Sequence, residues 1–339
     1  VAHGFYWGGV KQAALEEAQA AAEETPGAIE EANGALEEAY AALDEACREH
    51  GFFLISGHGA DALIERTWEQ AARFFDAGPQ VTEPLRRTEN NPLGYFDREL
   101  TKRKRDHKQV FDFTDPNTPE RDKYNRWPES LAGFRDAMVE FHTEFTSLAT
   151  RTLGLLHQVL ELGPESQTKM AFNSANSPVR LNHYPVGDPV PEDQRDGLIE
   201  LGETALGYHT DPGTLTLLLQ DSTGGLQTED RDGNWIDVPP EPGTIVVNLA
   251  DAVQVQTNDR WRAAVHRVIP MTTKRRFSIP YFANPSRHAL IEPLHELAAD
   301  PLYRSFDWTE FMAARTADNF ADLGTDDAQI TDYLLSATR

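Results

Sequence analysis

The amino-acid sequence predicts an α+β fold, with one β-sandwich core at about residues 178–285 and helices before and after it. Three observations favour this fold. Apolar residues recur with helical periodicity through much of the first half of the chain. Short β-branched runs separated by Gly, Pro and Asp-Gly turns follow residue 178, which is typical of sandwiches and barrels. A helical pattern returns at residues 286–339. No linker or repeat separates these parts of the chain, so we expect a single domain over residues 1–339.

The mainly helical part, residues 1–177, contains several recognisable elements. The Ala- and Glu-rich stretch at residues 10–50 predicts two helices that are separated by a turn at Pro26-Gly27. An apolar strand follows at residues 51–56, and a helix at about 60–77 ends before Gly78-Pro79. The longest helix is expected at residues 130–162, where apolar side chains recur every three or four positions and form a core-facing stripe.

The core and the tail complete the expected order of elements. The predicted core strands are 214–220, 225–228, 235–238, 244–248, 263–269 and 277–282. In the tail, Asp307 is placed to cap a final helix by accepting hydrogen bonds from its first backbone amides.

Composition excludes several classes of protein. A formal net charge of −24 argues against binding to nucleic acids or anionic membranes, which require clustered cations. No apolar run is long enough to span a bilayer and no signal peptide is evident, so we expect a cytoplasmic protein. The one cysteine, Cys47, cannot form an internal disulfide. The one basic run, Lys102 to Arg105, is interpreted as a solvated loop or a contact with an anionic substrate.

A candidate metal site begins at His209 and Asp211, which lie two positions apart and would project from one face of a strand. Such pairs also arise by chance, and His142 and Glu144 have the same spacing. That second pair lies within the long predicted helix, where residues two positions apart point to different sides. The pair at 209 and 211 is instead followed by Pro212-Gly213 and a strand, at the end of an element where functional groups are commonly presented.

His266, within the predicted strand 263–269, is the candidate for a third ligand, although an isolated buried histidine is also compatible with a purely structural role. Two His and one carboxylate form the facial triad of non-haem Fe(II) oxygenases. Ten residues later, Arg276 and Ser278 share one strand face and can bind a carboxylate, whereas Arg275 points to the opposite face.

The motifs around these residues resemble those of the isopenicillin N synthase-like family of Fe(II)/2-oxoglutarate-dependent oxygenases, the plant-type 2-oxoglutarate dioxygenase group. The similar segments are RLNHYP (180–185), LGYHTDPGTLTLLLQD (206–221), GGLQ (224–227), HRV (266–268) and RFS (276–278). Similarity covers about residues 90–285 well. The short apolar strand that usually opens this family is not evident in residues 1–9.

The resemblance implies a double-stranded β-helix (jelly-roll) core and a site with defined roles. His209, Asp211 and His266 would bind Fe(II), and Arg276 with Ser278 would hold 2-oxoglutarate. Asn182 and Tyr184 match positions that line the co-substrate, while His183 between them is interpreted as structural. The implied reaction consumes O2 and 2-oxoglutarate, releases succinate and CO2, and hydroxylates or desaturates a small organic metabolite.

Two alternatives stay open at this point. One is an Fe(II) oxidase of the same family that closes a ring without 2-oxoglutarate and uses the Arg-x-Ser pair for its substrate. The other is a non-catalytic jelly-roll ligand-binding protein. Halogenases of this type have a small residue in place of the carboxylate, so Asp211 disfavours that reaction. Substrate recognition is expected from the segments 94–113 and 282–284.

Overall fold

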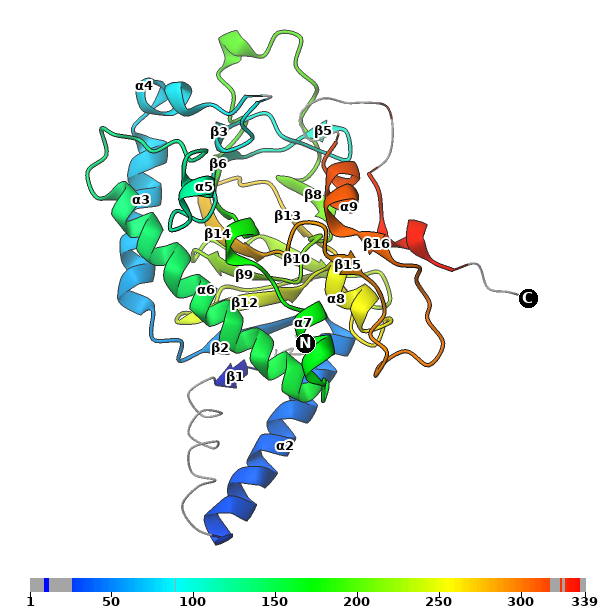
Figure 1. Cartoon of the computed structure of the whole chain (residues 1–339). Helices are drawn as coiled ribbons and strands as arrows, with labels where there is room; N and C mark the ends of the chain where they lie inside the picture. The colour runs from blue at the N-terminus through cyan, green and yellow to red at the C-terminus, as the bar shows by residue number, and fades with distance from the viewer. Residues whose placement is uncertain (1–8, 12–25, 89, 318–323, 325–326, 336–339) are drawn as a thin grey trace.

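The computed structural model describes residues 9–11, 26–88, 90–317, 324 and 327–335. Helices cover one side of a large central sheet, and a smaller sheet lies on the other side of a buried pocket (Figure 1). The helices longer than four residues are α2 (Pro26–Glu49), α3 (Asp61–Asp76), α6 (Phe134–Val159), α7 (Pro164–Lys169), α8 (Asp251–Gln256) and α9 (Trp308–Arg315).

The N-terminal helices differ from expectation in one respect. Pro26 and Gly27 are the first residues of α2 and do not form a turn between two helices. Proline suits the first position of a helix, because the amide that it lacks has no partner there in any case. The other helix expected in this region would fall on residues 12–25, which lie outside the described residues.

The large sheet has eight strands in the order β1-β2-β12-β9-β14-β7-β6-β3. Pairing is antiparallel except between β1 and β2, which run parallel. In this order the strands are β1 (Gly9–Lys11), β2 (Phe52–Ser56), β12 (Thr244–Leu249), β9 (Leu215–Gln220), β14 (Arg276–Ala283), β7 (Val179–Tyr184), β6 (Gln109–Phe113) and β3 (Gly94–Phe96). A short strand therefore lies at Gly9–Lys11, while the rest of the segment 1–9 lies outside the described residues.

The small sheet has the antiparallel order β11 (Trp235–Asp237), β10 (Leu226–Glu229), β13 (His266–Val268) and β8 (Leu206–His209). Strand 263–269 was predicted too long, because its first three residues lie outside β13. The chain crosses from the small sheet to the large sheet between β13 and β14, so His266 and Arg276 belong to opposite walls of the pocket.

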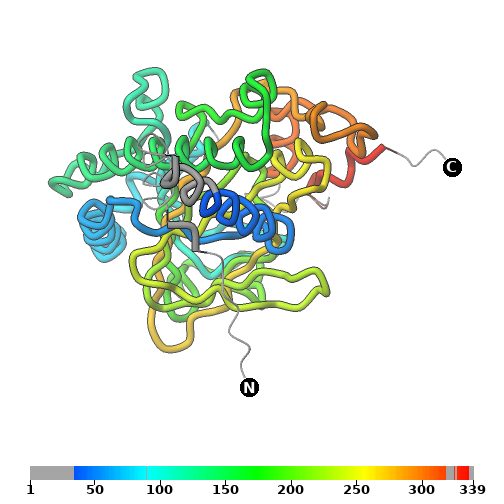
Figure 2. The backbone as a smooth tube through the Cα atoms, turned by 90° about the horizontal axis from the view of Figure 1, so that it is seen from below, coloured from blue at the N-terminus to red at the C-terminus, as the bar shows by residue number. Residues whose placement is uncertain are grey.

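The largest buried cluster joins residues from the front, the middle and the back of the chain. Leu43 of α2, Phe141 of α6, Leu217 of β9 and Leu294 near the C-terminal part all belong to it. Along α6 the predicted stripe is buried, with Phe134, Met138, Phe141, Phe145 and Leu148 fully enclosed. Figure 2 shows α6 as a long coil that passes beside α2 when the molecule is seen from below. Burial of this many apolar side chains is the main stabilising contribution to the fold.

The basic run forms a tight hairpin of β4 (Leu100–Thr101) and β5 (Lys104–Arg105). Arg105 is buried and pairs with Asp188 at 2.6 Å, so for this residue the expectation of a solvated loop or substrate contact is wrong. A second small pair, β15 (Leu290–Ile291) with β16 (Phe306–Asp307), precedes α9, and the Asp307 carboxylate caps that helix as predicted. No helix within the described ranges is long and apolar enough to cross a membrane.

Candidate active site

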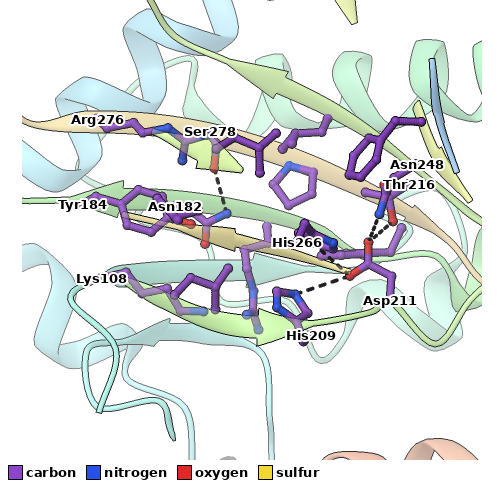
Figure 3. Close-up of a pocket in the computed structure, with 18 residues that line it drawn as sticks. Lys108, Asn182, Tyr184, His209, Asp211, Thr216, Asn248, His266, Arg276 and Ser278 are labelled. Atoms are coloured by element: carbon purple, nitrogen blue, oxygen red, sulfur yellow. Dashed lines mark hydrogen bonds and ion pairs between the residues drawn. The ribbon is translucent and has the colours of Figure 1, made fainter. Parts of the chain in front are cut away.

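A buried pocket of about 80 Å³ lies between the two sheets (Figure 3). Strands β14, β7 and β9 supply one wall, and β8, β10 and β13 supply the facing wall. Alternation along each strand explains the lining: Arg276, Ser278, Pro280 and Phe282 are every second residue of β14 and all face inward.

The three residues that the sequence singled out as metal ligands come together at one end of this pocket. His209 ends β8, Asp211 lies in the turn that follows it, and His266 begins β13 directly opposite His209. One ligand atom from each lies within 4.8 Å of the other two. The Nε2 atoms of His209 and His266 lie 3.6 and 3.9 Å from Oδ1 of Asp211.

Hydrogen bonds to the other ring nitrogens orient both imidazoles. Nδ1 of His209 donates to the carbonyl oxygen of Gly207 at 2.9 Å, and Nδ1 of His266 donates to that of Ala264 at 3.0 Å. Because a carbonyl oxygen only accepts, Nδ1 must carry the proton in each ring. Both Nε2 lone pairs are therefore directed toward the space beside Asp211, as metal-binding histidines require.

The Asp211 carboxylate is oriented in the same manner. Its Oδ2 accepts hydrogen bonds from Oγ1 of Thr216 at 2.6 Å and from Nδ2 of Asn248 at 2.8 Å, which leaves Oδ1 to face the two imidazoles (Figure 3). Thr216 and Asn248 are paired across β9 and β12, so the register of the large sheet positions both donors. Neither was identified from the sequence, although a buried Asn within the apolar run TIVVNL signals a need for a partner.

Electrostatics favour the protonation states of His209 and Asp211 that bind a cation. Burial lowers the pKa of His209, and the neighbouring charge of a protonated His266 would lower it further. Burial acts to raise the pKa of Asp211, but His266, His209 and the hydrogen bonds from Thr216 and Asn248 outweigh it, so the pKa falls below its usual value. Neutral imidazole and ionised carboxylate are the metal-binding forms. Two imidazole nitrogens and one carboxylate oxygen suit Fe(II).

The turn that carries Asp211 is held by donors from two helices. Four consecutive carbonyl oxygens each accept a hydrogen bond from outside the turn. The carbonyl oxygen of Thr210 accepts from Nη2 of Arg315 at 3.1 Å, and that of Pro212 accepts from Nε1 of Trp308 at 3.0 Å. Between and after them, the carbonyl oxygen of Asp211 accepts from the amide of Asp251 at 2.8 Å, and that of Gly213 accepts from the amide of Ala252 at 3.1 Å. Arg315 and Trp308 lie at the two ends of α9, and Asp251 and Ala252 begin α8. The donors thus alternate between the C-terminal helix and α8. Local sequence carries no signal for these contacts.

Arg276 lies at the other end of the pocket and has no acidic partner. Its guanidinium is 1% exposed, and none of its three nitrogens has a hydrogen-bond partner among the described residues. It lies over the Tyr184 ring at 5.0 Å, and Ser278 accepts a 3.2 Å hydrogen bond from Asn182. A buried cation without a counter-charge is costly, so this geometry requires an anionic ligand.

Three neighbouring residues of β7 point to the sides of the strand that alternation predicts. Asn182 and Tyr184 line the pocket opposite Ser278 and Arg276, respectively. His183 points to the other face of the sheet, where it stacks on Phe277 with ring centroids 4.9 Å apart. Arg275 also points away and pairs with Asp76 at the surface.

The alternative pair in α6 does not form a site. His142 is buried and its Nε2 lies 3.0 Å from the carbonyl oxygen of Ser177, whereas Glu144 is paired with Arg151 at 3.8 Å. His142 is therefore part of the buried packing of α6, and Glu144 belongs to its surface.

A buried ionic network forms the wall of the pocket near β6 and β7. Nζ of Lys108 lies 3.0 Å from Glu99 and 3.1 Å from Asp106, and Arg180 bridges Glu99 and Asp112 at 2.9 and 2.7 Å. Both Lys108 and Arg180 line the pocket. Arg87 joins the same network through Glu99 and Asp112. The sequence analysis did not identify these cations, because no motif in the sequence marks the network and Arg180 joins it from a strand about 70–80 residues away from its partners.

Comparison with known proteins gives a consistent result. Residues 175–285 match the model of the 2OG-Fe(II) oxygenase superfamily, and residues 28–130 match that of the non-haem dioxygenase in morphine synthesis N-terminal region. The chain is 31% identical over 292 residues to gibberellin 2-beta-dioxygenase of Phaseolus coccineus, covering 82% of this chain and 83% of that protein. It is 29% identical over 276 residues to feruloyl CoA ortho-hydroxylase 2 of Arabidopsis thaliana, covering 79% and 72%.

Solved structures resemble the whole arrangement. A full-length Neurospora crassa protein in complex with alpha-KG aligns with a TM-score of 0.69 at 26% identity and covers 83% of this chain and 90% of its own. JOX2 in complex with 2OG, Fe and JA aligns with a TM-score of 0.72 at 25% identity, covering 89% and 87%.

Proposed function

This chain belongs to the 2OG-Fe(II) oxygenase superfamily, and we propose that it oxidises a small organic metabolite in the pocket between its two sheets. Members of this superfamily use Fe(II), 2-oxoglutarate and O2. The reaction that we propose is hydroxylation or desaturation of the metabolite, with succinate and CO2 as co-products. The relatives named above, which act on a gibberellin and on feruloyl CoA, support a small-molecule substrate.

We assign Fe(II) to His209, Asp211 and His266. The support is the convergence of two Nε2 lone pairs and one carboxylate oxygen, each fixed by a hydrogen bond on its other atom. Bound iron would supply the redox chemistry that activates dioxygen while 2-oxoglutarate loses CO2. The protein groups hold the ligand atoms in place and keep bulk water out of the pocket.

We assign the distal carboxylate of 2-oxoglutarate to Arg276 and Ser278, with Tyr184 and Asn182 beside it. The single observation that carries this assignment is the buried guanidinium of Arg276, which has no partner among the described residues. A planar guanidinium can bind a carboxylate through two parallel hydrogen bonds, and an adjacent hydroxyl adds a third donor.

The substrate is proposed to approach from the side of Lys108, Arg180 and Phe282, which lies across the pocket from the small sheet. These residues belong to the segments 94–113 and 282–284 that were expected to recognise substrate, apart from Arg180 of β7. The three cations and three carboxylates of the network balance in formal charge, so this wall offers hydrogen-bond donors without a net positive charge.

For the architecture, we propose that the two sheets form a double-stranded β-helix and that the chain acts as one domain. The shared buried cluster that runs from α2 to the C-terminal part supports this proposal, since its pieces could not separate without exposing a common core.

Anaerobic addition of Fe(II) and 2-oxoglutarate should give a weak visible charge-transfer band. The band should be absent in His209→Ala, and a metabolite screen should then find compounds that stimulate succinate release. Failure to observe any band in the folded wild-type protein would reject the oxygenase assignment in favour of a non-catalytic binding protein. Substrate oxidation without succinate would instead indicate a ring-closing oxidase that does not use 2-oxoglutarate.

A further inference from the structure

A second, larger cavity of about 650 Å³ shares no lining residue with the pocket between the sheets. Four segments of the chain surround it: the loop at 90–93, the short helix α5 (Pro119–Asp122) with Tyr124, residues 173–176 before β7, and residues 286–287 after β14. This volume is within the range of small-molecule sites.

The walls of this cavity are tied to one another by three asparagines. Nδ2 of Asn91 donates to the carbonyl oxygen of Tyr124 at 2.8 Å, Nδ2 of Asn176 donates to that of Pro285 at 2.7 Å, and Nδ2 of Asn173 lies 3.2 Å from Oγ of Ser286. These bonds cross between segments that are distant in sequence. The cavity is therefore a shaped part of the fold.

Two arginines face this cavity without a counter-charge. The guanidinium groups of Arg121 and Arg287 make no ion pair or hydrogen bond within the described residues, and Nε of Arg121 is shielded from water. Burial lowers the pKa of Arg121 and the charge of Arg287 lowers it further, while Tyr124 and Asp115 act in the opposite direction.

Such a pair is unexpected in this protein. The sequence has 55 acidic residues and only 31 lysines and arginines, so a surface arginine can easily find a carboxylate. Arg66 does so with Glu140 at 2.6 Å, although both side chains are about half exposed. Arg121 is half-buried and Arg287 is exposed. Two unpaired guanidinium groups that line one cavity repel each other, and a bound anion would offset this repulsion.

The remaining polar lining is compatible with an anion. The amide of Asn90 and the hydroxyl of Tyr124 also line the cavity and make no side-chain hydrogen bond within the described part of the chain. Glu120 is the one acidic side chain among the lining residues, and it forms an ion pair with neither arginine.

We propose that this cavity binds a small oxyanion, a phosphate- or carboxylate-bearing molecule, through Arg121 and Arg287. Guanidinium groups recognise both anions through paired N–H donors, and two of them suit a ligand with more than one negative charge. The ligand would sit outside the pocket that holds the metal ligands, so its binding does not depend on the proposed oxidation reaction.

The test is calorimetric titration of the full chain with inorganic phosphate and, separately, with malonate, against chloride at equal ionic strength. At least one anion should bind and raise the thermal midpoint, and Arg121→Gln and Arg287→Gln should each weaken binding about tenfold or more. Phosphate and malonate distinguish the two sources of the oxyanion.

Matched variants distinguish anion binding in this cavity from binding in the pocket between the sheets and from an effect of net charge alone. Glu120→Gln should tighten binding, while Arg66→Gln, which changes net charge equally at a distant surface, should leave it unchanged. Arg276→Gln should remove only anion binding in the pocket between the sheets and leave the binding that depends on Arg121 and Arg287 unchanged. The proposal is overturned if neither anion binds, if binding survives both Arg121→Gln and Arg287→Gln, or if only Arg276→Gln abolishes it.

Discussion

Nε1 of Trp308 donates a 3.0 Å hydrogen bond to the carbonyl oxygen of Pro212, and this bond joins the C-terminal helix to the turn that carries Asp211. Trp308→Phe keeps a buried aromatic ring and removes the donor. We expect about a tenfold loss of Fe(II) affinity, because groups that orient metal ligands commonly have effects of this size. Anaerobic competition with a coloured chelator measures it.

Trp235→Phe is the matched control, since Trp235 lies on β11 and does not line the pocket. The control should bind Fe(II) as the wild type does. Unchanged iron affinity in Trp308→Phe would show that α9 only stabilises the fold.

Arg276→Gln tests the anion-binding end of the pocket. Loss of a charge-assisted pair of hydrogen bonds should weaken 2-oxoglutarate binding about 100-fold, measured by calorimetry with Mn²⁺ in place of Fe(II). In the absence of ligand the same variant should be at least as stable as the wild type, because it removes a buried charge without a partner.

The neighbouring Arg275→Gln removes only a surface ion pair with Asp76. It should leave 2-oxoglutarate affinity unchanged. Equal losses in the two variants would mean that net charge, and not the position of the guanidinium, governs binding.

Lys108→Met should destabilise the protein strongly. The substitution leaves Glu99 and Asp106 buried with one cation fewer, and breaking a buried pair in this way costs about 3–5 kcal/mol of unfolding free energy. Chemical denaturation measures the loss. Lys104→Met, which removes an exposed pair with Glu200, should change the unfolding free energy by less than about 1 kcal/mol. Similar values for the two lysines would contradict a buried network.

Protonation of His183 should lower stability in mild acid. Burial lowers its pKa to about 4, and the ordinary value in the unfolded chain is about 6.5. Nδ1 lies 2.7 Å from Oε1 of Gln109, while Nε2 is buried without a partner, so there is no acceptor for a second proton. Between these two pKa values the unfolded state binds more protons, so the stability present above pH 6.5 decreases as the pH falls toward 4.

At pH 5 this contribution amounts to about 2 kcal/mol relative to pH 7. Urea unfolding at the two pH values should show a smaller decrease for His183→Phe, which keeps a ring against Phe277. An equal decrease in both proteins would assign the acid sensitivity to other groups.

Much of the fold could be predicted because periodicity is a local property. The stripe of α6 follows from helical spacing, and the strands β9, β10, β12 and β14 follow from short β-branched runs between turn residues. Pro26 was misinterpreted because proline both breaks helices and begins them, and only its neighbours in space decide between these roles.

The residues of the site also fall into two groups, those that could be predicted from local sequence and those that could not. His209 with Asp211 and Arg276 with Ser278 were found from their two-residue spacing, and His266 from its place in an apolar run. Asp211 lies in the turn after β8 and not on the strand itself, yet it still reaches the two histidines. Thr216 and Asn248 depend on the register between β9 and β12, and Trp308 depends on where α9 docks. Such contacts between distant segments leave little trace in one sequence without related sequences for comparison.

The turn that carries Asp211 takes its hydrogen-bond donors alternately from α9 and α8, and this limits which part of the chain could be transferred to another protein as a catalyst. The segment that matches the oxygenase model, residues 175–285, contains the three proposed ligands and the donors from α8, but ends before Trp308 and Arg315. A minimal catalyst cut at residue 285 would therefore present the carbonyls of Thr210 and Pro212 without their donors. For protein engineering, the C-terminal helix belongs to the smallest transferable unit, even though it contributes no atom to the metal.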